Sequence, residues 1–253
     1  MRKLIYCLFF LLAVLAIPPS SFAEGKVVRF ASLDWPPYSG ASLPEQGANI
    51  TVAKAAFAAM GYELEVMFYP WARTIMVAKT NQFLGYFPEY YAKEIEKDFI
   101  FSDPIGDSPL GFAERKDNSV SWTTLNDLTS VKAIGVVRGY VNTEDFDKMA
   151  AAGLLKVEPV VEDSINLRKV AARRIPLAVI DKYVLQYILK TDENLIPKSH
   201  LLQFNPRLLE SKKLYLCFQK SDDGRRYLKI FNDGLKKIDV DKITKDYFEK
   251  VLK

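Results

Sequence analysis

Apolar and polar positions follow two different rhythms along the chain, and stretches of the two kinds alternate from end to end. Runs that are continuously apolar, or apolar at every second position, predict strands, whereas apolar residues three or four positions apart predict helices. The predicted strands span residues 27–33, 64–68, 83–87, 133–137, 156–161, 177–180 and 214–218. The predicted helices span residues 50–60, 71–80, 89–98, 143–152, 164–172, 182–190, 225–238 and 243–252. This alternation predicts an α/β fold with largely parallel sheets.

Two polar stretches without such a rhythm divide the alternation into halves. One covers residues 115–119, and the other surrounds Pro206 and leads back to the last predicted strand. We therefore expect two lobes joined by two hinge crossovers, with residues 24–115 and 214–253 in lobe 1 and residues 116–213 in lobe 2. Two lobes joined in this way enclose a cleft, which is the usual place for a ligand in an α/β protein.

The first 23 residues have the pattern of a secretory signal peptide. A basic start at residues 1–3 precedes an apolar run at 4–17, and small residues flank Phe22 before the expected cleavage after Ala23. The apolar run is shorter than the roughly 20 residues that a membrane-spanning helix needs. We therefore expect a soluble protein outside the cytoplasm.

Composition narrows the classes of function. The 253 residues include 35 Lys and Arg against 31 Asp and Glu, and because these charges are scattered, binding to nucleic acid is not expected. Cleavage after residue 23 leaves Cys217 as the single cysteine, so the protein must be stabilised by its core without disulfides. No glycine-rich nucleotide motif, P-loop, CxxC, HExxH or GxSxG sequence is present. We expect no cofactor, no metal and a monomer, with His200, the one histidine, in a structural role.

Several segments resemble the family 3 extracellular solute-binding proteins, the bacterial periplasmic proteins that deliver polar amino acids to ABC importers. The similar segments are Phe-Ser-Asp-Pro at 101–104 with Ser108 after it, Asp-Trp-Pro-Pro-Tyr at 34–38, Ile-Gly-Val-Val-Arg-Gly at 134–139 and Ala-Val-Ile-Asp at 178–181. They occur in the family's order and cover essentially the whole chain after residue 23. The resemblance implies a periplasmic-binding-protein type II fold and a periplasmic location.

The chain also departs from that family at two places. The family's amino-acid binders hold the ligand carboxylate with an Arg shortly before the Phe-Ser-Asp-Pro motif, and residues 87–95 contain no Arg here. Tyr140 and Val141 stand where the family has small hydroxyl residues. We therefore expect ordinary L-amino acids to bind weakly.

Candidate ligand contacts in lobe 1 lie at the predicted ends of strands and starts of helices. Trp35 and Tyr38 flank the turn made by two prolines, where they either contact a ligand or cover the core. Trp71 and Arg73 lie at the start of a predicted helix, where they could together bind an anion. The alternative for Arg73 is that it is a solvent-exposed helix residue.

Further candidates lie around the predicted turn at residue 89 and at the hinge. Tyr86 and Glu89 flank that turn, and Glu89 either contacts a cationic or hydroxylated ligand or serves as a first-turn helix charge. Ser108 offers a hydroxyl beside the hinge strand.

Lobe 2 supplies the remaining candidates. Arg138, Tyr140 and Asp181 follow predicted strands and are expected at the edge of the cleft. For Asp181 the alternative is that it caps the helix that begins at residue 182.

The sequence thus favours an extracytoplasmic solute-binding protein that closes its lobes on a small polar molecule, with an ABC-type permease as the implied partner. A ligand-sensing module for a membrane receptor would have the same sequence features. A dehydratase-like enzyme on the same fold is a third interpretation, in which Glu89 and Asp181 would transfer protons.

Overall fold

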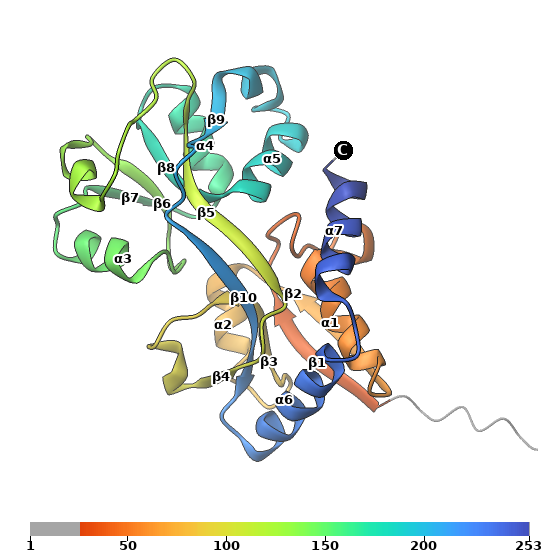
Figure 1. Cartoon of the computed structure of the whole chain (residues 1–253). Helices are drawn as coiled ribbons and strands as arrows, with labels where there is room; N and C mark the ends of the chain where they lie inside the picture. The colour runs from red at the N-terminus through yellow and green to blue at the C-terminus, as the bar shows by residue number, and fades with distance from the viewer. Residues whose placement is uncertain (1–25, 253) are drawn as a thin grey trace, which may run out of the picture.

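The computed structural model describes residues 26–252, which form two lobes that share one ten-stranded sheet (Figure 1). The strands are β1 (Lys26–Ser32), β2 (Tyr62–Phe68), β3 (Gly85–Tyr90), β4 (Phe99–Phe101), β5 (Gly106–Arg115), β6 (Ile134–Val137), β7 (Val157–Val160), β8 (Leu177–Asp181), β9 (Leu202–Phe204) and β10 (Glu210–Gln219). The helices are α1 (Ala48–Ala58), α2 (Trp71–Val77), α3 (Glu144–Ala151), α4 (Asp163–Ala171), α5 (Lys182–Thr191), α6 (Asp222–Leu235) and α7 (Val240–Val251). The predicted signal peptide, residues 1–23, lies outside the described residues.

The strand order along the sheet is β2-β1-β3-β10-β5-β8-β6-β7, with β4 on β10 and β9 on β5. Strands β1–β3 pair in parallel at one end and β6–β8 at the other, as the βα alternation predicts. The centre differs from the prediction, because β10 is antiparallel to β3 and β5, and β5 is antiparallel to β8. The long strands β5 and β10 run between the lobes in opposite directions, which makes the middle of the sheet antiparallel (Figure 1).

The passage between lobes takes place within these two strands. Leu110 of β5 pairs with Glu210 on one side and with Asp181 on the other. Before Leu110, β5 pairs with β10, and after it with β8 and β9. The change of partner thus lies before residue 115, and the boundaries expected at residues 115 and 214 stay a prediction.

Aromatic packing stabilises lobe 1, in which α1 and α6 cover the sheet (Figure 1). The Phe30 ring on β1 lies 5.9 Å from that of Phe57 on α1 and 5.1 Å from that of Phe218 on β10. Phe231 on α6 completes the group, 5.0 Å from Phe57. All four rings are fully buried, so removal of apolar surface from water fixes the helices on this face.

The prediction of a helix at residues 89–98 is wrong. Strand β3 continues through Tyr90, which pairs with Leu214 of β10, and only Ile95–Lys97 forms a short 3-10 turn. Pro88 lacks an N–H, yet the strand accommodates it beside a register shift in β10. Pairing with a neighbouring strand therefore outweighs the local helical pattern and places Glu89 on the sheet.

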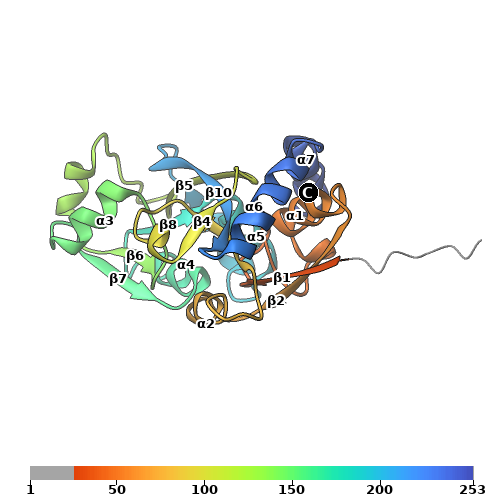
Figure 2. The same cartoon turned by 90° about the horizontal axis from the view of Figure 1, so that it is seen from below.

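When viewed from below, the two lobes overlap, with α3 at one end of the molecule and α1 and α7 at the other (Figure 2). Within residues 26–252, none of the helices combines the length and the apolarity needed to cross a membrane.

Candidate functional site

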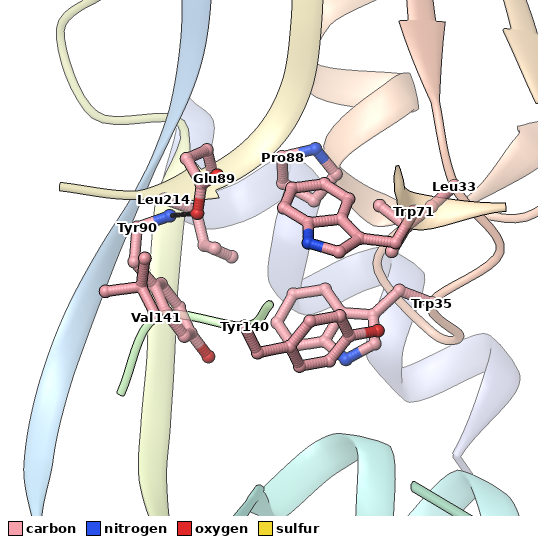
Figure 3. Close-up of a pocket in the computed structure, with 9 residues that line it drawn as sticks. All are labelled: Leu33, Trp35, Trp71, Pro88, Glu89, Tyr90, Tyr140, Val141 and Leu214. Carbon is pink, nitrogen blue, oxygen red and sulfur yellow. Dashed lines mark hydrogen bonds between the residues drawn. The ribbon is translucent and has the colours of Figure 1, made fainter. Parts of the chain in front are cut away.

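Two small cavities lie where the lobes meet. The first, of about 30 Å³, is lined by Leu33, Trp35, Trp71, Pro88, Glu89, Tyr90, Tyr140, Val141 and Leu214 (Figure 3). The second, of about 20 Å³, is lined by Trp35, Tyr90, Leu110, Val137, Tyr140, Val141, Asn142, Asp163, Val179, Ile180 and Asp181. Each volume is enough for about one or two water molecules. Hydrogen bonds from Trp71 Nε1 to the Gly139 carbonyl and from the Tyr38 hydroxyl to Asp181 join the lobes directly, so the lobes are in a closed arrangement.

Trp35 lines both cavities and comes from the loop after β1. A turn through Pro36 and Pro37 follows Trp35. The backbone N–H of Trp35 donates to the Ser39 carbonyl, and the backbone N–H of Ser39 donates to the Trp35 carbonyl. The indole stacks on the Tyr38 ring with centroids 4.6 Å apart and meets the Tyr90 ring at 83°. Proline-fixed backbone and ring packing thus hold this wall of the site in one orientation.

Trp71 begins α2 and reaches across to lobe 2. Its Nε1 donates to the carbonyl oxygen of Gly139 over 3.0 Å, and its ring meets that of Tyr140 at 86° with centroids 5.8 Å apart. In Figure 3 the indoles of Trp35 and Trp71 border the same space, with the Glu89 carboxylate at its edge. Trp71 is therefore both a cavity wall and a contact between lobes.

Glu89 is a buried carboxylate in the first cavity. Its Oε1 accepts from the Tyr90 backbone N–H at 2.8 Å and its Oε2 from the Tyr86 hydroxyl at 3.1 Å. Burial raises the pKa of Glu89 to about 7, although these two donors and the charge of Lys212 lower it. A carboxylate offers about four acceptor positions, so Glu89 can accept further hydrogen bonds from a ligand.

Asp163 is a second buried carboxylate, in the second cavity, and it is the first residue of α4. Burial raises the pKa of Asp163 to about 7, and the neighbouring Asp181 and Glu162 add to the rise. Sequence reasoning missed Asp163, although its position after a predicted strand is the signal used for Arg138 and Asp181.

Asp181 is held by four donors. As the N-cap of α5, its Oδ1 accepts from the backbone N–H groups of Tyr183 and Val184. Its Oδ2 accepts from the Tyr38 hydroxyl at 2.9 Å and the Ser108 hydroxyl at 2.6 Å. Burial still raises the pKa of Asp181 to about 6. In this closed arrangement, Asp181 has no acceptor position left for a ligand.

Ser108 and Tyr86 support the site from behind. Ser108 is fully buried on β5, and because it donates to Asp181, the Tyr90 hydroxyl must donate to the Ser108 oxygen, 2.5 Å away. Tyr86 packs on Trp71 at 5.8 Å and donates to Glu89. Neither residue lines a cavity, so both position residues that do. Tyr90 itself, which lines both cavities, was missed because its segment has a helical pattern.

The two candidate arginines do not reach the cavities. Arg73 is exposed, and its guanidinium lies 5.0 Å from the centre of the Tyr69 ring. Arg138 is also exposed, and only its backbone, which donates to Val160, is fixed. His200 is an exposed residue of the 3-10 turn Ile196–Leu201. In the described part of the chain, no cluster of three or more His, Cys, Asp or Glu could hold a metal.

Comparison with known proteins adds evidence on the fold. No family model and no curated protein matches the chain. Three solved structures cover 90% of it: an amino acid ABC transporter substrate-binding protein from Streptococcus pneumoniae bound to L-arginine (18% identity, TM-score 0.69, 94% of that chain), a histidine kinase sensor domain with similarity to periplasmic binding proteins (18%, 0.72, 96%) and the ancestral amino acid-binding protein AncCDT-1, a precursor of cyclohexadienyl dehydratase (21%, 0.67, 96%). At these identities the likeness establishes the two-lobed periplasmic-binding-protein type II fold alone.

Proposed function

We propose that this protein is an extracytoplasmic solute-binding protein that captures a small polar molecule between its lobes. The observation that carries the proposal is the origin of the cavity walls. Trp35, Trp71 and Glu89 come from lobe 1, whereas Tyr140 and Asp163 come from lobe 2, and all five surround space at the junction. Mostly apolar and aromatic walls with a few polar groups are typical of small-molecule sites.

The closed arrangement also supports capture by movement of the lobes. A cavity of about 30 Å³ is much smaller than an amino acid or a sugar, so a ligand has to enter while the lobes are apart. The Trp71–Gly139 hydrogen bond and the Tyr38–Asp181 hydrogen bond break when they separate. A ligand that bridges the lobes then stabilises a form closed around it by its differential affinity.

The proposed partner is an ABC-type permease, in line with the resemblance to family 3 binding proteins and a periplasmic location. A membrane receptor is the second candidate, supported by the structural likeness to a histidine kinase sensor domain. Uptake of labelled ligand that is lost on deletion of the gene supports import. Intact uptake with loss of a ligand-dependent transcriptional response supports sensing.

An enzymatic role receives less support from the site. A proton-transferring pair would use Glu89 and Asp181, but Asp181 is already bonded to four donors in the closed form. We therefore propose binding without turnover. Mass spectrometry of a ligand recovered after long incubation should return it unchanged, whereas a dehydrated or otherwise altered product would contradict this proposal.

The function is tested by a thermal-shift screen against amino acids, amines, sugars and organic acids, followed by calorimetry. We expect saturable one-to-one binding by at least one class. That binding should weaken in Tyr140→Ala, which removes a lobe 2 wall, and should be unchanged in Tyr187→Ala, a lobe 2 tyrosine on α5 that lines neither cavity. A protein that binds no member of any class would contradict the proposed function.

A further inference from the structure

We infer that the ligand is an organic cation without a carboxylate, an amine whose charged nitrogen lies against Glu89 and between the rings of Trp35, Trp71 and Tyr140. This inference rests on the proposed function and narrows its ligand class. Three properties of the site carry it, namely the charges that line the cavities, the orientation of the rings and the location of the nearest cations.

The charges at the cavities are all of one sign. Glu89, Asp163 and Asp181 line them, and no Lys, Arg or His does. A ligand carboxylate would be buried beside these groups without a cationic partner, which is costly, whereas an ammonium would pair with a carboxylate. Glu89 is better placed than Asp181, because two acceptor positions of Glu89 are free, while Asp181 has none.

The rings that border the cavities stand at right angles in pairs. Trp71 meets Tyr140 at 86°, and Trp35 meets Tyr90 at 83°. All four rings line the first cavity, and in Figure 3 the rings of Trp35, Trp71 and Tyr140 border the same space. A cation within about 6 Å of the face of such a ring is attracted by the ring quadrupole, most strongly by that of Trp. Two Trp and two Tyr around a carboxylate therefore favour a positive group with apolar substituents.

Neither Lys212 nor Arg73 lines a cavity, although the charge of Lys212 acts on Glu89. Lys212, which pairs with Ser108 across the sheet, has its Nζ 5.5 Å from the Tyr90 ring centre and 3.6 Å from the Glu210 carboxylate. Arg73 stacks on Tyr69. No guanidinium fork is thus available to bind a carboxylate in the way that an α-amino acid needs.

Matched pairs of ligands test this inference directly. Each amine is compared with its parent amino acid by calorimetry: cadaverine with lysine, agmatine with arginine, histamine with histidine and tyramine with tyrosine. We expect at least one amine to bind more tightly than its parent by about tenfold or more, a difference of about 1.4 kcal/mol. Tighter binding of the parent amino acids overturns the inference. Binding of sugars or organic acids but not amines also overturns it while leaving the proposed function intact.

Two pairs of variants locate the amine. Glu89→Gln, which keeps the shape of the side chain, should weaken amine binding about tenfold, while Glu63→Gln, on the exposed edge of β2, should not change it. Trp71→Leu should weaken binding, while Trp122→Leu, whose ring packs on Phe112 in lobe 2, should not. Circular dichroism confirms that each variant is folded. Full affinity in folded Glu89→Gln and Trp71→Leu overturns the inference.

Discussion

The hydroxyl of Tyr38 in lobe 1 donates to Oδ2 of Asp181 in lobe 2 over 2.9 Å. The other oxygen of the same carboxylate caps α5 through two backbone N–H groups, so the acceptor is fixed by the first turn of a helix. Tyr38 is only 1% exposed, and the bond is therefore shielded from water. This contact joins the lobes close to Leu110, where β5 changes partner.

Removal of this hydroxyl should loosen the closed form. In Tyr38→Phe the ring packing on Trp35 is retained and one hydrogen bond to a carboxylate is lost, which shifts the closed–open equilibrium by about 1–3 kcal/mol. We expect small-angle scattering to give a larger radius of gyration for the variant than for the wild type. Tyr62→Phe is the control, because its ring packs on Tyr227 within lobe 1. Identical radii for Tyr38→Phe and the wild type would show that the bond does not hold the lobes.

The free energy of unfolding should decrease as the pH rises from about 4.5 to 7. Burial raises the pKa of Glu89 and of Asp163 to about 7 and that of Asp181 to about 6. In this range the folded protein keeps protons that the unfolded chain has lost, so raising the pH favours unfolding. The groups that face Glu89 are Lys212, whose charge lowers the pKa, and Tyr86, Tyr140 and Cys217, which stay protonated.

Urea unfolding at about pH 5 and about pH 7.5 measures this dependence. We expect a smaller difference between the two conditions in Glu89→Gln than in the wild type, because one of the three linked protons is absent. An equal difference in both proteins would mean that Glu89 ionises at its ordinary pKa.

The affinity for an amine should increase as the pH rises from about 6 to about 8. The carboxylate of Glu89 attracts a cation only when it is ionised, and its pKa of about 7 places this change near neutrality. Binding should therefore release protons, and calorimetry in buffers of different ionisation enthalpy measures their number. A ligand whose affinity falls as the pH rises from about 6 to about 8 would contradict an ion pair with Glu89.

The exported protein should begin at Glu24 and contain one thiol that is protected by the fold. Cys217 is fully buried, and burial raises the pKa of its thiol well above the ordinary value. We expect no reaction with a thiol reagent in buffer and one equivalent of reaction in denaturant.

Amino-terminal sequencing checks the cleavage after Ala23. Retention of Met1 on a membrane-bound form would contradict the predicted export.

The alternation of strands and helices was visible in the sequence because each element has its own apolar rhythm. At residues 89–98 the local apolar rhythm and the structure disagree. Glu89 and Tyr90 belong to a strand because they pair with Tyr215 and Leu214, more than a hundred residues further along the chain. No local pattern records a partner at that distance, so the strand end could not be placed.

The residues of the site could be named only in part from the sequence. Trp35, Trp71, Glu89 and Tyr140 line the first cavity. Glu89 lies within β3 and not at the start of a helix, and contact of these residues with a ligand stays a prediction. The roles of Tyr86 and Ser108 behind the site, and the four donors to Asp181, depend on side-chain geometry between distant elements. The sequence lists the chemical groups but not their hydrogen bonds, and these bonds decide which groups remain free for a ligand.

The position of β10 has a consequence for the order of folding. This strand lies between β3 and β5 in the sheet, although it follows both of them in the chain. Without β10, the strands β1–β3 lack the partner that joins them to β5, and long-range pairing of this kind forms slowly. Completion of the shared sheet therefore waits for a contact between segments that are distant in the sequence.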